Sequence, residues 1–454
     1  MATRLKVSTK PTSFTVRNLI NKTRTLFNEL PDVRKKKTAN NLKYAISDAA
    51  LSAFSVLFTP SPSFLDYQTR MQKKLGKNNA QSLFGIHPIP STNQIRNLLD
   101  PVEPKTVYPL IKEINDGLYQ NGYLKSLRSI NSTLLLAIDG TDFFSSQKIS
   151  CPCCHQQTLN NGKTLYRHSA ITPAIVASGC SHVVPLPPEF ITPPEGNDKQ
   201  DGEITAAKRW LNTWGEHYSA WSITILDDDL YSHQPFFQEA IKHGFEVLAV
   251  CKPNSHPWLY EWIAGFERGG HLREIERTHW DGKQRLTEHY RYINRVPLRD
   301  GDDALMLNWC QVTITNAEGE VTYNNAWVTT HRIIDENVAK IVTAGRTRWK
   351  IENENNNVLK NNGYHFDHNF GHGKPHLSNL FATLIVLSFL LHTTLDWIDT
   401  AYHTVCHLLP SRRTFFEHLR ALLQYIPFNS WEQMMRFMLE ALDGETIPDL
   451  TKGT

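Results

Sequence analysis

The sequence has few of the features that mark secreted, repetitive or disordered proteins. Its 454 residues include only 7 cysteines, and their uneven spacing does not resemble a disulfide framework. No apolar stretch of useful length follows residues 1–6, so no signal peptide is expected. The chain contains no internal repeat and no low-complexity tract. These absences favour a globular protein in a reducing compartment, and a cytoplasmic location is expected.

Long apolar runs are also scarce, and a single segment could be taken for a membrane span. Residues 377–395 carry no charged side chain and are nearly long enough to cross a bilayer. Several polar residues interrupt the run, among them Asn379, Ser388 and His392. We therefore expect a buried core helix and no membrane partner, with a membrane span as the alternative.

The chain has little net charge, but the charge is unevenly distributed. The formal net charge is +3, yet residues 1–80 hold 15 Lys and Arg against 4 Asp and Glu. That segment therefore carries +11, and the rest of the chain carries −8. A basic end suggests a polyanion partner, most simply DNA, while a solvated helical surface is the alternative. The expected DNA-contacting residues in this segment are Arg34, Lys35, Lys36 and Lys37.

Hydrophobic periodicity and turn residues divide the chain into five expected regions. The fold class that they predict is α/β, with a mixed sheet flanked by helices. Residues 1–125 form a helical, basic DNA-binding part, and residues 126–254 form the first part of an α/β core with a Cys-rich excursion at 150–182. A β-rich insertion follows at 255–335. Residues 336–400 hold a Glu-bearing helix and a core helix, and residues 401–454 form a helical C-terminal part.

A helix start is predicted near the end of the first region. Ser91, Thr92 and Asn93 are typical N-terminal residues of a helix that continues through residue 99. This segment could be the second helix of a helix-turn-helix, with Gln94 and Arg96 near a DNA groove. A plain capped helix is the alternative.

Three acidic residues indicate chemistry. Asp139 follows the apolar run at 134–138, Asp228 follows a second run at 223–226, and Glu352 lies in a helix-like stretch. Strands that end in Asp place carboxylates at the carboxyl edge of a sheet, where α/β proteins form their sites. Two such acids and a helical Glu can hold two Mg²⁺ or Mn²⁺ ions. Neighbouring acids compete for these positions, namely Asp142, Asp227, Asp229 and Glu354.

The three acids, in this order and with a β-type insertion before the third, resemble the DDE transposases of bacterial insertion sequences. The resemblance covers residues 130–400 and implies a ribonuclease-H-like core in which the first and fourth strands lie side by side. It implies catalysis by Asp139, Asp228 and Glu352 with two Mg²⁺ ions, which cleave and join DNA strands. The implied partners are double-stranded DNA, terminal inverted repeats, target DNA and a second copy of the chain in a homodimeric synaptic complex.

One branch of that family has a signature of Tyr, two residues, Arg, three residues, Glu, six residues and Lys. Arg348 and Glu352 match it, whereas Gly345 replaces the Tyr, and Lys360 lies one position late. Arg348 is four residues before Glu352, so both side chains share a helical face. The resemblance implies DNA contacts by Arg348 and Lys360, and Lys350 is a further expected contact.

The Cys-rich excursion forms a second candidate constellation. Cys151 and Cys154 have the C-x₂-C spacing of half a tetrahedral zinc site. His168 and Cys180 are the preferred further ligands, with His155 and His182 as alternatives. A loop of reduced thiols without zinc is the other interpretation. Magnesium avoids thiolate, so this would be a structural zinc site and not the catalytic one.

Three functions remain open at this point. The leading hypothesis is a transposase. The others are a catalytically silent DNA-binding protein derived from a transposase, and another nuclease with a ribonuclease-H-like fold. Mg²⁺-dependent strand transfer would separate the first from the other two.

Overall fold

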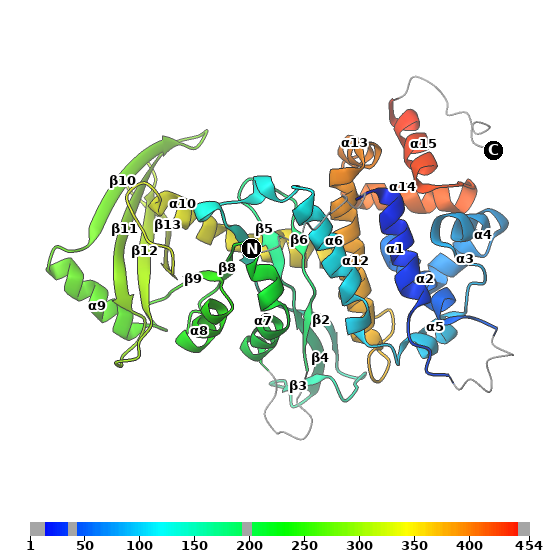
Figure 1. The fold of residues 1–454 in the computed structure, drawn as a ribbon, viewed down its shortest axis with the longest axis horizontal. Coiled ribbons are helices and arrows are strands. Elements are labelled where there is room, and N and C mark those ends of the chain that lie inside the picture. Colours follow the sequence, from blue (N-terminus) through cyan, green and yellow to red (C-terminus); the bar gives the residue numbers. More distant parts are fainter. Residues whose placement is uncertain (1–13, 35–42, 193–201, 444–454) are drawn as a thin grey trace, which may run out of the picture. The chain divides into compact units, whose positions relative to one another are not determined.

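The computed structural model describes residues 14–34, 43–192 and 202–443, and the chain is mixed α/β (Figure 1). It forms two compact units. We call the first the sheet unit, which comprises Leu124–Ser146 and Cys154–Val358. The second, the helical unit, comprises Met1–Tyr123, Gln147–Cys153 and Leu359–Thr454. These units cut the chain differently from the five expected regions, because N-terminal and C-terminal helices pack together in one core.

The centre of the sheet unit is a nine-stranded mixed sheet in the order β10-β11-β12-β13-β9-β8-β1-β5-β6. Strands β1, β8 and β9 are parallel, whereas β5 is antiparallel to β1 and β6 is antiparallel to β5. Every residue of β1 and β8 is buried, and most are apolar, which is typical of strands covered on both faces. The five strands of this part are β1 (Leu134–Ala137), β5 (Ala174–Val176), β6 (Val184–Pro185), β8 (Ile223–Asp227) and β9 (Glu246–Val250).

Helices support this part of the sheet. Helix α7 (Glu203–Ser219) packs against α8 (Gln234–Lys242), and both α8 and α10 (Val338–Arg346) contact β9. The buried side of α7 includes Trp210, whose ring is stacked 5.7 Å from that of Tyr218. Helix α7 also contacts β4 (Thr164–Ile171) and β7 (Glu189–Ile191), and these contacts help to fix the residue at its N-terminus.

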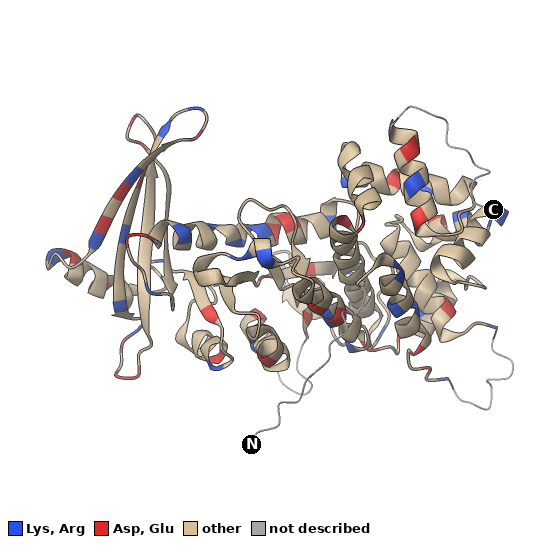
Figure 2. Ribbon diagram, turned by 45° about the horizontal axis from the view of Figure 1, so that its top comes forward, with Lys and Arg blue, Asp and Glu red and all other residues tan. Residues whose placement is uncertain are grey.

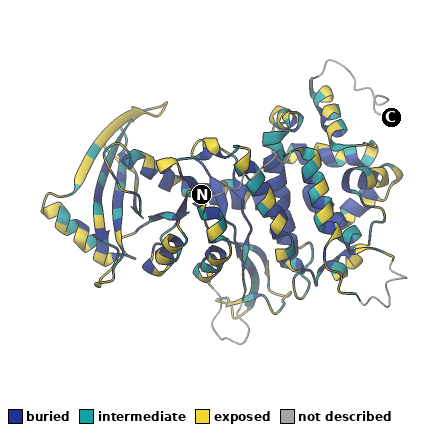
Figure 3. Cartoon of the chain, in the orientation of Figure 1, coloured by how far each residue is buried: buried dark blue, intermediate teal, exposed yellow. Residues whose placement is uncertain are grey.

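The remaining four strands extend the sheet beyond β9. They are β10 (Arg273–Trp280), β11 (Arg285–Pro297), β12 (Met306–Thr315) and β13 (Val321–Thr329), and they follow α9 (Pro257–Arg268). The expected β-type region thus contains four strands and one helix that was not expected. Edge strand β10 is almost entirely exposed and carries charges of both signs (Figures 2 and 3). Such charges discourage edge-to-edge pairing with another chain.

A smaller second sheet belongs to the same unit. It consists of β2 (Gly140–Ser146), β3 (His155–Thr158), β4 (Thr164–Ile171) and β7 (Glu189–Ile191), with β4 paired to the other three. Strand β2 begins directly after Asp139, so the chain leaves the first sheet at that residue and enters the second.

The helical unit is built around α12 (Leu377–Ile398), which packs against α2, α5, α6 and α13. Among the described residues α12 is the helix whose length and composition could span a membrane, and 78% of its most apolar window is buried. The predicted core helix is therefore present (Figure 3). The other helices of this unit are α1 (Val16–Asn28), α2 (Ile46–Phe58), α3 (Phe64–Met71), α4 (Lys74–Asn79), α5 (Thr92–Leu99), α6 (Tyr108–Gln120), α13 (Thr400–Leu408), α14 (Arg412–Tyr425) and α15 (Trp431–Asp443).

Candidate active site

Two of the three predicted acids, Asp139 and Asp228, follow strands that end at the same edge of the sheet. Strands β1 and β8 are adjacent and parallel, with Ala137 in register with Leu226. Asp139 and Asp228 each lie two residues beyond this pair, and the Ile138 amide still donates to the Leu226 carbonyl at 3.3 Å. Because the strands are parallel and in register, the two carboxylates start from equivalent positions.

Glu352 lies on a helical segment of changing pitch. Helix α10 continues as a 3₁₀ turn at Thr347–Trp349, a π turn at Ile351–Asn356 and α11 at Asn357–Asn361. The sequence suggested a regular helix here, but π turns within helices often occur at functional sites. Arg348 donates to the Glu352 carboxylate, so the expected pairing across one turn is present. The Glu352 side chain is 53% exposed and can meet a ligand from solvent.

Negative charge accumulates around Asp139. Burial raises the pKa of Asp139 to about 7; the Arg348 charge opposes this shift, and the Glu203, Glu352 and Asp228 charges add to it. The side chains of all three predicted acids therefore share one electrostatic environment. Asn356 Nδ2 lies 3.4 Å from Asp139 Oδ2, and Thr172 Oγ1 donates to Asn356 Oδ1 at 2.7 Å.

The Asp triplet at 227–229 has three different environments. Asp227 is buried at the end of β8 and neither of its carboxylate oxygens has a hydrogen-bond partner. Burial, and next the Asp228 charge, raise the pKa of Asp227 well above its ordinary value. Asp229 accepts from the Lys252 amide at 2.8 Å and from Ser255, so it holds a loop. Asp228 is partly exposed and accepts only a local bond from the Leu230 amide at 2.8 Å among those described.

Sequence reasoning missed a fourth acid, Glu203. It is the first residue of α7, and its Oε1 accepts from the Gly140 amide at 2.9 Å and from the Tyr231 hydroxyl at 2.7 Å. Gly140 follows Asp139 in the chain, and Tyr231 lies three residues after Asp228. Glu203 therefore ties together the two segments that carry the strand-end acids. Its one signal in the sequence was an acid in a helical first turn, which is a common stabilising position.

The predicted DNA-contacting residues of the sheet unit differ in exposure. Arg348 is 18% exposed at its side chain and pairs with Glu352. Lys350 is buried, with Nζ 3.9 Å from Glu354 Oε1 and 5.1 Å from the centre of the Trp349 ring. Trp349 itself is 47% exposed, so it does not anchor the core. The exposed flat surface next to the acids is this ring, while Lys350 is covered.

The other predicted DNA contacts lie in the helical unit or beyond the described residues. Lys360 is in the helical unit, on α11. Arg34 pairs with Asp32 and donates to the Tyr44 carbonyl at 3.0 Å. Lys35, Lys36 and Lys37 lie outside the described residues.

The candidate groove-reading helix is α5. Ser91 and Gln94 cap its start reciprocally, and Arg96 Nε donates to the Phe370 carbonyl at 2.9 Å. Two side chains proposed for a DNA groove are thus used inside the helical unit. This favours the plain capped helix over the helix-turn-helix.

The predicted zinc ligands do not form one group within the sheet unit. Cys154 Sγ lies 3.4 Å from His168 Nε2, whereas Cys180 Sγ lies 3.8 Å from His182 Nδ1. Among the described residues, Cys180 belongs to no set of three or more potential ligand atoms close enough for one metal ion. Cys151 belongs to the helical unit. The structure thus supports Cys154 with His168 as a pair and separates Cys180 from it.

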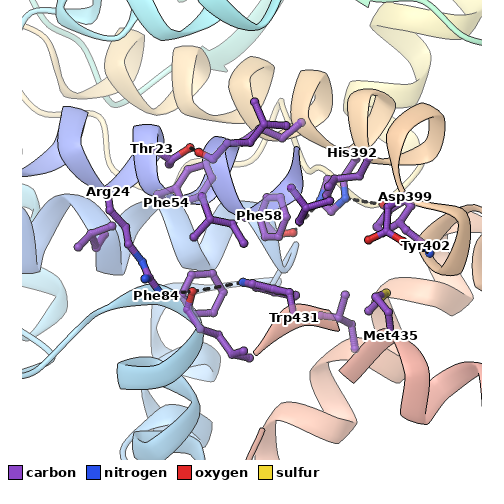
Figure 4. Close-up of a pocket in the computed structure, with 18 residues that line it drawn as sticks. Thr23, Arg24, Phe54, Phe58, Phe84, His392, Asp399, Tyr402, Trp431 and Met435 are labelled. Carbon is purple, nitrogen blue, oxygen red and sulfur yellow. Dashed lines mark hydrogen bonds between the residues drawn. The ribbon is translucent and has the colours of Figure 1, made fainter. Parts of the chain in front are cut away.

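A cavity of about 60 Å³ lies inside the helical unit, between α1, α2, α12 and α15 (Figure 4). Aromatic and aliphatic side chains line it, including Phe54, Phe58 and Phe84. The His392 ring is bonded at both nitrogens, to the Tyr402 hydroxyl at 2.6 Å and to the Phe58 carbonyl at 2.9 Å. A gap this small, lined mostly by apolar side chains, is a packing feature of the helical unit.

The chain was compared with known protein families and with curated proteins. No family model matches it, and no curated protein matches it. Function must therefore be inferred from the site itself, because a fold class alone does not determine an activity.

Proposed function

We propose that this protein is a DDE transposase that cleaves DNA strands and transfers them with the help of Mg²⁺. One observation carries the proposal: Asp139 and Asp228 follow adjacent parallel strands that are in register, and the charges of Asp228 and Glu352 both act on Asp139. This is the arrangement that a two-metal phosphodiester site requires.

The strand order supports a ribonuclease-H-like core. In chain order, the five core strands are β1, β5, β6, β8 and β9, and the first and fourth of them are neighbours. The second is antiparallel to the first, and the fourth and fifth are parallel to it. Strands β10 to β13 come between Asp228 and Glu352 in the chain, where the related transposases carry an insertion.

The residues present fit a divalent cation. The charges of three carboxylates, those of Asp228, Glu352 and Glu203, act on Asp139, and the Arg348 charge partly offsets their effect. Carboxylate oxygens are the ligands that Mg²⁺ prefers, and a bound cation would favour the ionised form of Asp139. When bound by Asp139, Asp228 and Glu352, Mg²⁺ supplies activation of water and stabilisation of the leaving oxygen.

The protein's own residues position the reacting groups. Glu203 holds the backbone after β1 and the Tyr231 side chain after β8, so Asp139 and Asp228 keep a fixed separation. Arg348 donates to the Glu352 carboxylate and orients it, while Arg348 Nη1 is buried without a hydrogen-bond partner among the described residues. Trp349, exposed beside Arg348, offers a ring on which an unpaired base can stack. Double-stranded DNA is thus the proposed substrate, and pairing of two DNA ends would involve a homodimer.

A strand-transfer assay with purified full-length protein tests the proposal. The substrates are DNA fragments that carry the inverted repeats flanking the gene, with Mg²⁺ or Mn²⁺ added or withheld. We expect metal-dependent nicking at the repeat ends and joining of the freed 3′-hydroxyl to a target plasmid. Asp139→Asn should abolish both reactions. Asp142→Asn is the matched control, because Asp142 pairs with Arg167 in the second sheet.

Each failure has a distinct meaning. Nicking without joining would replace transposase with another nuclease of the same fold. DNA binding without any nicking, unchanged in Asp139→Asn, would indicate a catalytically silent DNA-binding protein. Activity that survives Asp139→Asn but not Asp142→Asn would move the site to the second sheet.

A further inference from the structure

A second cluster of metal-binding side-chain types lies in the helical unit. Asp396 is in the last turn of α12, and His403 and His407 are four residues apart on α13. Residues at this spacing share a helical face. One ligand atom from each of the three residues lies within 4.8 Å of the others. We propose that Asp396, His403 and His407 bind one zinc ion at the corner between α12 and α13.

The distances suit a single ion. His403 Nδ1 lies 3.1 Å from Asp396 Oδ1, and the rings of His403 and His407 have centroids 4.1 Å apart. With zinc bonds of about 2.0–2.2 Å, two ligands of a tetrahedral site are roughly 3.4 Å apart. Both histidine side chains are exposed, so their rings can turn by the small amount that coordination requires.

The ligand set selects a metal class different from that of the three-acid site. Two imidazoles and one carboxylate suit Zn²⁺ and other transition-metal ions, whereas Mg²⁺ prefers oxygen ligands only. Three protein ligands leave a fourth position for water. The Asp396 side chain is 13% exposed and is held close to the protein surface, so one ligand is fixed before the metal arrives.

The surrounding helices favour a cation at this corner. Asp396 lies at the carbonyl end of α12, where the helix dipole attracts positive charge. Asp399 caps α13 by accepting from the amides of Ala401 at 2.9 Å and Tyr402 at 3.1 Å, which fixes the angle at which α13 begins. The Arg412 charge also acts on Asp396 and offsets part of this attraction. The result is a surface site with three ligands, in which the Asp399 cap fixes the backbone of α13 before a metal binds.

Zinc titration of the metal-stripped full-length protein by calorimetry tests the site. A His403→Ala, His407→Ala variant should lose at least 100-fold in affinity, since loss of outer-shell partners alone costs 10- to 100-fold. The matched control is His418→Ala, an exposed histidine on α14, which should bind as the wild type does. Circular dichroism without metal checks that the variants fold, and both substituted side chains are exposed.

Cobalt spectroscopy separates this site from the cysteines. Co²⁺ bound by Asp396, His403 and His407 should give visible ligand-field bands without a thiolate charge-transfer band. The bands should persist in a Cys151→Ser, Cys154→Ser variant. If zinc affinity is the same in the double histidine variant and the wild type, if all bound cobalt shows sulfur ligation, or if the protein binds no zinc, the proposal is refuted.

Discussion

One buried polar residue in each unit makes a useful comparison, because the two are in opposite situations. In the helical unit, Asn79 donates to the carbonyls of Leu423 at 2.8 Å and Ile426 at 2.7 Å and accepts from the Phe428 amide at 2.8 Å. In the sheet unit, Asp227 is buried with no hydrogen-bond partner for either oxygen. A satisfied buried polar group stabilises a fold, whereas an unsatisfied charge costs free energy. The difference between these two residues agrees with the proposal that the active site lies in the sheet unit, and Asn79 is an example of a purely structural polar contact in the helical unit.

The largest effect is expected from a substitution in the proposed active site of the sheet unit. Asp228→Asn should lower DNA cleavage by roughly 10³-fold or more, because a lost metal ligand removes several kcal/mol of transition-state stabilisation. DNA binding and the melting temperature should change little, since Asp228 makes only a local contact. Single-turnover cleavage, a filter-binding assay and thermal melts measure the three quantities. Glu354→Gln serves as control because Glu354 lies near Lys350 instead of the strand-end acids.

The converse effect is expected in the helical unit. Asn79→Ala removes three hydrogen bonds and leaves two carbonyls and one amide in the interior without their partner. The free energy of unfolding should fall by about 3 kcal/mol, with one lost bond costing ~1 kcal/mol and an unsatisfied group more. Urea denaturation measures the change. Cleavage per folded molecule should be unaltered, and a drop in that rate would contradict the division between the units.

Glu203 allows a finer test, because it is a positioning residue in the sheet unit. Glu203→Ala leaves the Gly140 amide and the Tyr231 hydroxyl without their acceptor, and cleavage should fall by about 10- to 100-fold. Glu203→Gln keeps an acceptor oxygen and should recover most of that loss. If both variants lose activity equally and to the level of Asp228→Asn, the charge of Glu203 matters, and it belongs among the ligands.

Much of the sheet could be predicted from local patterns. Asp139 and Asp228 follow strands as expected, because apolar runs bounded by polar residues define buried strands. Strand β2 was missed because its mixed residues lack alternation, and α9 was missed because its aromatic residues also suit strands. The helical unit depends on contacts between the two ends of the chain, which no local pattern encodes.

The candidate site could be predicted only where a functional side chain directly follows a strand. The sequence leaves Asp227 and Asp229 as competitors of Asp228, and the engagement of Asp229 and the burial of Asp227 required coordinates. The exposure of Trp349 and burial of Lys350 also depend on the 3₁₀ and π turns, which shift the helical faces from those of a regular helix.

The smallest expected effect concerns the pH dependence of stability in the metal-free protein. The pKa of Asp139 is raised to about 7, so between about pH 4 and 7 the folded state holds a proton that the unfolded state has released. Stability should therefore fall as the pH rises through this range. Asp139 is partly exposed, which limits its contribution to the order of 1 kcal/mol, or a few degrees in melting temperature.

Substitutions show which carboxyl groups cause the dependence of stability on pH. Asp139→Asn should flatten the curve in part, and the Asp139→Asn, Asp227→Asn variant should flatten it further, because burial raises the pKa of Asp227 in the same direction. Asp142→Asn should leave the slope in place. Saturating Mg²⁺ should also reverse the trend, since a bound cation stabilises the ionised carboxylates that destabilise the empty site. If the stability of the metal-free protein instead rises from pH 4 to 7, in the wild type and in Asp139→Asn, the ionised acids are stabilised by other groups in the fold. That result would remove the contrast between Asn79 and the buried acids of the sheet unit.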